Sequence, residues 1–335
     1  MSTDRGDRLR TWLPELRGGR FAVGVNLPWV DYGTDFGTSS WHTLGGIGAR
    51  PASLERLDRT LAALAADGIR LVRLFMLCDA RSGIRFDPGG LPLALDEEVF
   101  ADMDALLATA ERHGVRVMAV LFDFHLCKPP RIAGGVQLGG RGRLVATEEG
   151  RTALVERVVQ PLARRYGDRD AIAAWDLFNE PEWCLRLLPP LTRAFDPFEA
   201  LQGFLESAVT AVRSSARQPV TVGSAGTWQL DLVRTLELDF YQVHWYERFG
   251  RKALDQPVSR FDLDAPVILG EFSGRHANVA DVLQAARRAG YVGAFVWSVL
   301  AEDNQSAYPA EVVEWARAHA REPVTDSAVR TPGRS

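Results

Sequence analysis

Lysine is nearly absent from this chain of 335 residues, because only Lys128 and Lys252 occur among its 39 basic side chains. Both fall in predicted loops, so chemistry through a lysine Schiff base at a strand end is not expected. The three cysteines, Cys78, Cys127 and Cys184, are widely spaced and form no CxxC pair. This spacing argues against a disulfide framework, a structural zinc site or a redox motif.

Long apolar runs and blocks of like charge are missing as well. No segment approaches the roughly 20 apolar residues of a membrane span, and the N-terminus lacks the apolar core of a secretory signal. The 39 basic and 43 acidic residues leave a net charge of -4 with no basic cluster, so neither nucleic acid nor a membrane is expected as a partner. We expect a cytoplasmic protein, or a secreted one if a leader was removed from this sequence.

The remaining composition, 46% hydrophobic and 24% charged, is that of an ordinary globular protein. Short apolar and β-branched runs alternate with stretches of helical period, which is typical of βα units and a parallel sheet. The predicted strands are residues 21–26, 69–75, 115–122, 171–178, 220–222, 240–244, 267–269 and 294–297. The clear predicted helices are residues 53–67, 96–113, 148–166, 198–215, 278–289 and 309–320.

Eight such units in a chain of this length predict an α/β fold, a single (β/α)8 TIM barrel with long strand-end loops. Ser53 is the expected cap of the first helix, and Gly114 is expected to end the second. We predict an N-terminal extension over residues 1–20, the catalytic barrel over 21–321 and a loose tail over 322–335.

Two glutamates follow predicted strand ends, where a TIM barrel keeps its chemistry. Glu180 follows strand 171–178 in the sequence Asn-Glu-Pro, and Glu271 follows strand 267–269 in Gly-Glu-Phe. Hydrolysis of a glycosidic bond needs one carboxylic acid to protonate the departing oxygen and a second carboxylate on the other face of the sugar. The two positions predict such a pair across one barrel mouth.

These two motifs resemble those of clan A retaining glycoside hydrolases, and the whole set is most similar to glycoside hydrolase family 5, the cellulase and mannanase family. The resemblance implies Glu180 as acid/base and Glu271 as nucleophile, with no cofactor. The charge of Glu271 is expected to keep Glu180 protonated. The other implied roles are a sugar 2-hydroxyl contact for Asn179, support of Glu271 by Arg73 and Tyr246, binding of sugar hydroxyls or of Glu180 by His125 and His244, and an apolar floor from Trp297.

Tryptophans in strand-end loops are candidate sugar-stacking surfaces, with Trp29, Trp183 and Trp228 preferred. The segments 27–52 and 126–147 are both long, and closure of one end of the cleft by either of them would favour soluble, short or terminal substrates. No HExxH motif or tight acidic cluster is present, so no metal is expected.

The sequence therefore predicts a retaining β-glycoside hydrolase acting on β-glucan or β-mannan oligosaccharides or polysaccharides. Two alternatives stay open. A transglycosylase would use the same covalent intermediate, and a non-catalytic carbohydrate-binding barrel would use the same fold and aromatic residues.

Overall fold

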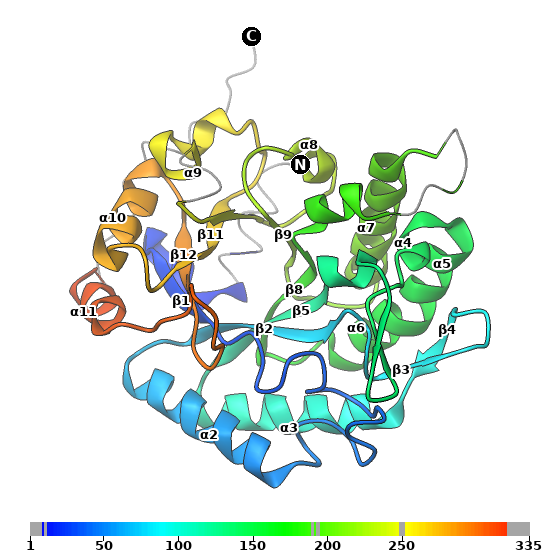
Figure 1. The fold of residues 1–335 in the computed structure, drawn as a ribbon. Coiled ribbons are helices and arrows are strands. Elements are labelled where there is room, and N and C mark those ends of the chain that lie inside the picture. The colour runs from blue at the N-terminus through cyan, green and yellow to red at the C-terminus, as the bar shows by residue number, and fades with distance from the viewer. Residues whose placement is uncertain (1–8, 10–11, 189–190, 192–194, 248–251, 320–335) are drawn as a thin grey trace.

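The computed structural model describes Leu9 and residues 12–188, 191, 195–247 and 252–319. Eight parallel strands close into a barrel in the order β1-β12-β11-β10-β9-β8-β5-β2, and helices surround them (Figure 1). This confirms the predicted (β/α)8 barrel. The barrel strands are β1 (Ala22–Asn26), β2 (Leu71–Cys78), β5 (Arg116–Asp123), β8 (Ile172–Asn179), β9 (Val220–Ser224), β10 (Tyr241–Trp245), β11 (Val267–Ser273) and β12 (Gly293–Trp297).

The predicted helices are present, and the segments after the fifth and sixth barrel strands carry only short ones, α8 and α9. The predicted helix 148–166 contains one π-helical turn, η3, between α5 and α6. No helix in the described ranges is long and apolar enough to cross a membrane. The helices are α2 (Pro51–Ala66), α3 (Glu97–His113), α4 (Arg143–Ala146), α5 (Glu148–Leu154), η3 (Val155–Val159), α6 (Gln160–Tyr166), α7 (Pro197–Arg213), α8 (Asp231–Arg234), α9 (Lys252–Asp255), α10 (Val279–Ala289) and α11 (Ala310–His319), with 3-10 turns η1 (Pro14–Gly19), η2 (Phe124–Cys127), η4 (Pro181–Arg186) and η5 (Val258–Arg260).

The start of α2 differs from the prediction, because the helix begins at Pro51 and Ser53 does not cap it. The Ser53 hydroxyl donates to Asp31 Oδ2 at 2.9 Å instead. Proline suits the first helical position, since its φ is already helical and its missing N–H would have no partner there. The predicted limits of α3 are confirmed, with Asp96 capping its first turn and Gly114 ending it at a φ of 61°.

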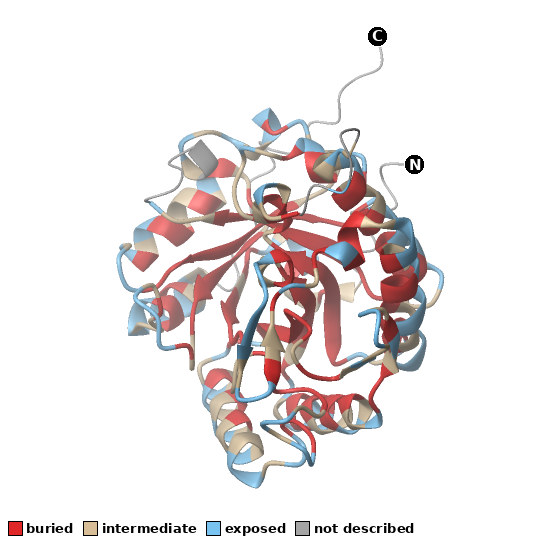
Figure 2. Ribbon diagram, turned by 45° about the vertical axis from the view of Figure 1, so that its right-hand side comes forward, coloured by how far each residue is buried: buried red, intermediate tan, exposed pale blue. Residues whose placement is uncertain are grey.

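The N-terminal end of the barrel is filled by apolar side chains. Leu13 and Leu16 are buried in one cluster with the barrel residue Phe295, and the Trp12 indole donates to a strand carbonyl at 2.9 Å. Gly24 is required beside Phe295, because a Cβ there would lie 2.4 Å from the ring. Figure 2 shows the barrel strands buried and the exposed residues on the outer helices and loops. Chemistry is therefore confined to the opposite end.

The first part of the predicted extension 1–20, residues 1–8 and 10–11, and the whole predicted tail 322–335 lie outside the described residues. All three cysteines are buried and free, as expected.

The rim of the barrel mouth holds two hairpins that the sequence analysis read as loop. One pairs β3 (Ile84–Phe86) with β4 (Pro92–Leu95), and the other pairs β6 (Arg131–Ala133) with β7 (Val136–Leu138). The second occupies the predicted loop 126–147, and its turn residues Gly134 and Gly135 both have positive φ. Strands of three or four residues are too short to show alternation, which explains why the pattern did not predict them.

The long segment after β1 is ordered by a buried carboxylate of α3. Asp102 accepts backbone N–H bonds from Gly37, Gly46 and Gly48 at 2.8, 2.8 and 2.7 Å. These charge-assisted bonds satisfy loop donors that would otherwise be buried without a partner. The loop is thus a fixed wall of the barrel mouth.

Candidate active site

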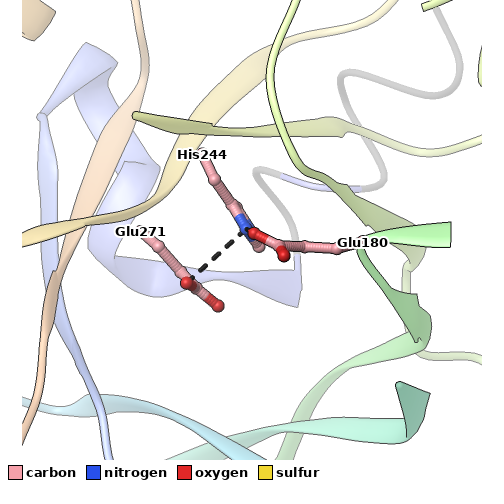
Figure 3. A group of neighbouring side chains, drawn as sticks. All are labelled: Glu180, His244 and Glu271. Carbon is pink, nitrogen blue, oxygen red and sulfur yellow. Dashed lines mark hydrogen bonds and ion pairs between the residues drawn. The ribbon is translucent and has the colours of Figure 1, made fainter. Parts of the chain in front are cut away.

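The two predicted catalytic glutamates meet at the C-terminal mouth of the barrel. Glu180 follows β8, whereas Glu271 lies inside β11, which continues to residue 273 and does not end at residue 269 as predicted. Figure 3 shows the two side chains pointing toward one another, with His244 of β10 beside both. One oxygen of the Glu180 carboxylate lies within 4.8 Å of one oxygen of the Glu271 carboxylate. Retaining glycosidases place the two carboxyl groups about 5–5.5 Å apart, whereas inverting enzymes need about 6.5–9.5 Å.

The backbone is irregular at or next to both glutamates, and these irregularities orient their side chains toward each other. Glu180 has φ 54° and ψ 51°, a left-handed conformation that costs energy for a residue other than glycine, and its N–H donates to Gly223 O at 2.7 Å. The register between β10 and β11 shifts at Gly270, so that Glu271 is paired with His244. A Cβ at position 270 would lie 3.0 Å from the His244 ring, so glycine permits this approach.

Glu271 accepts one hydrogen bond on each oxygen. Arg73 Nη1 donates to Oε1 at 2.6 Å and the Tyr246 hydroxyl donates to Oε2 at 2.7 Å. Burial raises the pKa of Glu271, while the neighbouring His244, the Arg73 charge and the Tyr246 bond act to lower it. Arg73 and Tyr246 therefore both contact Glu271, and both stabilise its ionised form.

Arg73 is fully buried and joins Glu271 to the strand that precedes Glu180. Its Nε donates to Asp176 Oδ2 at 2.8 Å and its Nη2 donates to Asn179 Oδ1 at 2.8 Å. Because Asn179 Oδ1 is engaged in this way, Nδ2 is the group left to donate to a sugar. Asp176 was not among the predicted site residues, although a carboxylate inside an apolar strand indicates a buried cationic partner.

Glu180 is held by two aromatic nitrogen atoms. His244 Nδ1 lies 3.0 Å from Oε1, and Trp183 Nε1 donates to Oε2 at 2.9 Å. Burial raises the pKa of Glu180 to about 7, with the Trp183 bond and the Arg73 charge opposing it. Burial is thus the largest cause, and not the charge of Glu271 that the sequence analysis named. Burial also lowers the pKa of His244 to about 4, which leaves its ring neutral at pH 7.

His125 lies in a network next to this pair. Its Nδ1 is 3.0 Å from the Tyr32 hydroxyl, which donates to Asp123 Oδ2 at 2.7 Å. The backbone N–H of His125 donates to Asp123 Oδ1 at 2.8 Å, and its ring stacks on Phe124. The charges of Asp123 and His125 influence the pKa of Glu180, so His125 borders the site while its hydrogen bonds go to Tyr32 and Asp123.

Aromatic side chains border the nucleophile. Trp297 ends β12 and packs edge-on against Trp29 and Phe75, with ring centroids 5.9 and 6.2 Å apart. Tyr246, which donates to Glu271, packs against the same cluster. Trp297 and Trp29 therefore form an aromatic surface on this side of the site.

A second aromatic group borders the acid. Trp183 packs between Trp228 and Phe124, with centroids 5.5 and 6.5 Å away. Trp228 is 45% exposed. A cavity of about 580 Å³ opens from Glu180 and Trp183 toward the loops after β9, β10, β11 and β12; its further lining residues are Ala225, Trp245, Tyr246, Glu247, Ser273, His276, Ala277, Asn304 and Gln305. This volume suits sugar units on the Glu180 side.

A third carboxyl, that of Glu182, was not predicted to matter. It is buried two residues after Glu180, and Ala225 N donates to its Oε2 at 3.0 Å. Burial raises the pKa of Glu182 to about 8. Its place two residues after a candidate catalytic residue was the only available signal, because burial cannot be read from Asn-Glu-Pro-Glu.

Glu180, His244 and Glu271 offer ligand atoms close enough to hold a metal ion. The guanidinium of Arg73, however, already supplies a positive charge to Glu271 at 2.6 Å. The Glu271 carboxylate is thus paired with the Arg73 cation, and it lies beside Glu180, whose raised pKa favours the protonated acid. At neutral pH it offers a nucleophile and a proton donor across one gap, which is the chemistry of glycoside cleavage with retention.

The chain matches a family model described as cellulase (glycosyl hydrolase family 5) over residues 36–304. It is 24% identical over 324 residues to a mannan endo-1,4-beta-mannosidase of Mytilus edulis, covering 83% of each protein. It is 23% identical to the enzyme of that name from Cryptopygus antarcticus, covering 83% of this chain and 80% of that protein.

Among solved structures, the endo-1,4-beta-mannanase from Eisenia fetida has the same fold, with a TM-score of 0.72, 22% identity and coverage of 91% and 92% of the two chains. The family model spans most of the described barrel, including both glutamates and the residues that hold them. This chain belongs to glycosyl hydrolase family 5 and is a retaining β-glycoside hydrolase.

Proposed function

We propose that this protein hydrolyses β-1,4-mannosidic bonds within mannan chains, with Glu180 as acid/base and Glu271 as nucleophile. The observation that carries the chemistry is the pair of carboxylates within 4.8 Å, one held by Arg73 and Tyr246 and the other buried with a raised pKa. The choice of mannan is supported by the relatives from Mytilus edulis and Cryptopygus antarcticus.

In the first step, a Glu271 oxygen attacks the anomeric carbon while Glu180 gives its proton to the glycosidic oxygen. The sugar–oxygen bond breaks as the ester bond to Glu271 forms, and one half of the chain leaves with a new hydroxyl group. Because the pKa of Glu180 is about 7, its carboxyl group is protonated in most molecules below pH 7 and in about half of them at pH 7. Arg73 and Tyr246 keep Glu271 ionised and oriented for attack.

In the second step, ionised Glu180 takes a proton from water, whose oxygen attacks the same carbon and releases Glu271. Esterified Glu271 carries no charge, so the repulsion that its carboxylate exerts on Glu180 is absent at this stage. Two inversions at one carbon give net retention. Asn179 Nδ2 is placed to donate to the sugar 2-hydroxyl, a contact that tightens as the ring approaches an oxocarbenium ion.

We favour cleavage inside the chain because aromatic surfaces border both carboxylates. Trp29 and Trp297 lie on the side of Glu271, and Trp183 and Trp228 lie on the side of Glu180. The long loops favoured short or terminal substrates, and the lengths of the products from mannan distinguish the two modes of cleavage.

The test is product release from soluble β-mannan, β-glucan and xylan by the wild type, by Glu271→Gln and by Glu206→Gln, which changes an exposed residue on α7. The wild type and Glu206→Gln should shorten mannan to mixed oligosaccharides, and Glu271→Gln should be slower by at least about a thousandfold. Wild-type turnover in Glu271→Gln would refute the nucleophile, and cleavage of β-glucan alone would refute the substrate.

The same assay separates the alternatives. Incorporation of labelled mannobiose, supplied in excess as acceptor, into longer oligosaccharides would identify a transglycosylase. Mannan binding without any product from the wild type would identify a non-catalytic barrel.

A further inference from the structure

Trp183 lies one turn of 3-10 helix after Glu180 and bonds to it. η4 begins at residue 181, and the Trp183 backbone N–H donates to Glu180 O at 3.2 Å. Because a 3-10 helix has three residues per turn, this geometry places the indole of Trp183 over the side chain of Glu180. The indole Nε1 then donates to Glu180 Oε2 at 2.9 Å.

The two oxygens of Glu180 face different neighbours. Oε1 lies 3.0 Å from His244 Nδ1, and the same nitrogen lies 3.6 Å from Glu271 Oε2. Oε1 is therefore the oxygen on the side of the nucleophile, where the glycosidic bond must lie. Oε2 is engaged by Trp183.

Trp183 and His244 differ in what they can do for the acid. The indole N–H only donates, whereas a neutral imidazole nitrogen either donates or accepts. The carbonyl oxygen of a carboxylic acid accepts hydrogen bonds better than its hydroxyl oxygen. Donation from Trp183 to Oε2 thus favours the form of Glu180 that carries its proton on Oε1, and His244 adapts to either state.

The ring of Trp183 is fixed by its packing against Trp228 and Phe124. It also lines the cavity that opens from Glu180. A leaving sugar in this cavity therefore contacts the same side chain that holds the acid.

We propose that Trp183 is a positioning residue for proton transfer: its indole N–H engages Oε2 so that Oε1 delivers the proton, and its ring places the leaving sugar beside that oxygen. This inference rests on the proposed function of Glu180. It is specific to the donor atom, because a purely structural role would need only the ring.

The test uses aryl β-mannobiosides whose leaving groups range from dinitrophenol to phenol, so that no sugar occupies the leaving-group side. Trp183→Phe keeps an aromatic ring and removes the N–H. We expect hydrolysis of the phenyl substrate to fall about 10- to 100-fold and that of the dinitrophenyl substrate less than about threefold, because a good leaving group needs little protonation. The basic limb of kcat/KM should also move to higher pH, since the Trp183 bond lowers the pKa of Glu180.

Two further variants serve as controls. Trp41→Phe makes the same chemical change at a 39% exposed tryptophan of the loop after β1 and should leave both the leaving-group dependence and the pH profile unchanged. Benzothienylalanine at position 183 keeps the full bicyclic ring and replaces N–H by sulfur, so it should reproduce the change seen in Trp183→Phe even where the smaller ring weakens folding.

Equal losses for all leaving groups, an unmoved basic limb or wild-type behaviour of the benzothienylalanine variant would each overturn the role of the N–H. These outcomes differ from failure of the proposed function, in which the wild type releases no aryl group or Glu180→Ala behaves like the wild type.

Discussion

The buried carboxyl of Glu182 makes the stability of this protein depend on pH in a way that one substitution should remove. The pKa of Glu182 is raised to about 8 by burial, whereas an unfolded chain has the ordinary value near 4.5. The folded state therefore binds a proton between these values that the unfolded state does not. Stability from such a group is fully present below the unfolded pKa and is lost as pH rises through the folded pKa.

The size of the effect follows from the shift. Below pH 8 the folded wild type holds this proton and the unfolded chain does not, so the free energy of unfolding falls by about 1.4 kcal/mol for each pH unit. Above pH 8 both states have lost the proton and the fall levels off. The total loss between pH 6 and pH 9 is about 2–3 kcal/mol. Glu182→Gln cannot ionise, and its amide oxygen can still accept from Ala225 N. For a chain of this length the entropy of unfolding at Tm is about 0.7 kcal/mol per degree. The Tm of the variant should therefore rise by about 4 °C relative to that of the wild type over this pH range.

The assay is thermal unfolding of both proteins at pH 6, 7, 8 and 9, with Glu206→Gln as an exposed control. Glu180 titrates in both proteins, so the loss of its proton affects both unfolding curves. The Tm difference should widen with pH for Glu182→Gln and stay constant for Glu206→Gln. Parallel curves for the wild type and Glu182→Gln would refute a buried, protonated Glu182.

Three further predictions concern catalysis. Arg73→Lys should lower kcat at least about 100-fold, because one ammonium group cannot replace a fork that bonds Asp176, Asn179 and Glu271 at once; an unchanged kcat on mannan would contradict this. Glu180→Ala should lose about 100- to 10,000-fold on mannan and far less on dinitrophenyl substrates, and equal losses in parallel assays would argue against the acid. The pH profile of kcat/KM should fall above about pH 7 as Glu180 ionises and also at low pH as Glu271 is protonated, so full activity at pH 9 would be inconsistent with this acid.

The local pattern of apolar residues along the chain was sufficient to predict the fold. The alternation of apolar runs and helical periods predicts βα units, and successive βα units of one hand close into a barrel in chain order. The C-terminal parts of β8 and β11 then place Glu180 and Glu271 at one mouth, which is why motif and topology together predicted that these two carboxylates would face one another. The hairpin β6–β7 escaped prediction because three-residue strands carry no periodic signal.

The tertiary structure determined the hydrogen-bond partners and the pKa values of Glu180 and Glu271. Arg73 and Glu271 are 198 residues apart in the chain, and their contact depends on barrel closure and on the register shift at Gly270. The pKa of Glu180 is raised mainly by burial, a property of the packed site that no single motif encodes. The sequence marked Trp183 as a sugar-stacking aromatic residue, but only the left-handed backbone of Glu180 and the following 3-10 turn bring its N–H to the acid. Residue types and spacing thus determined which groups are present, and distance and desolvation, which depend on the whole fold, determined their protonation and their partners.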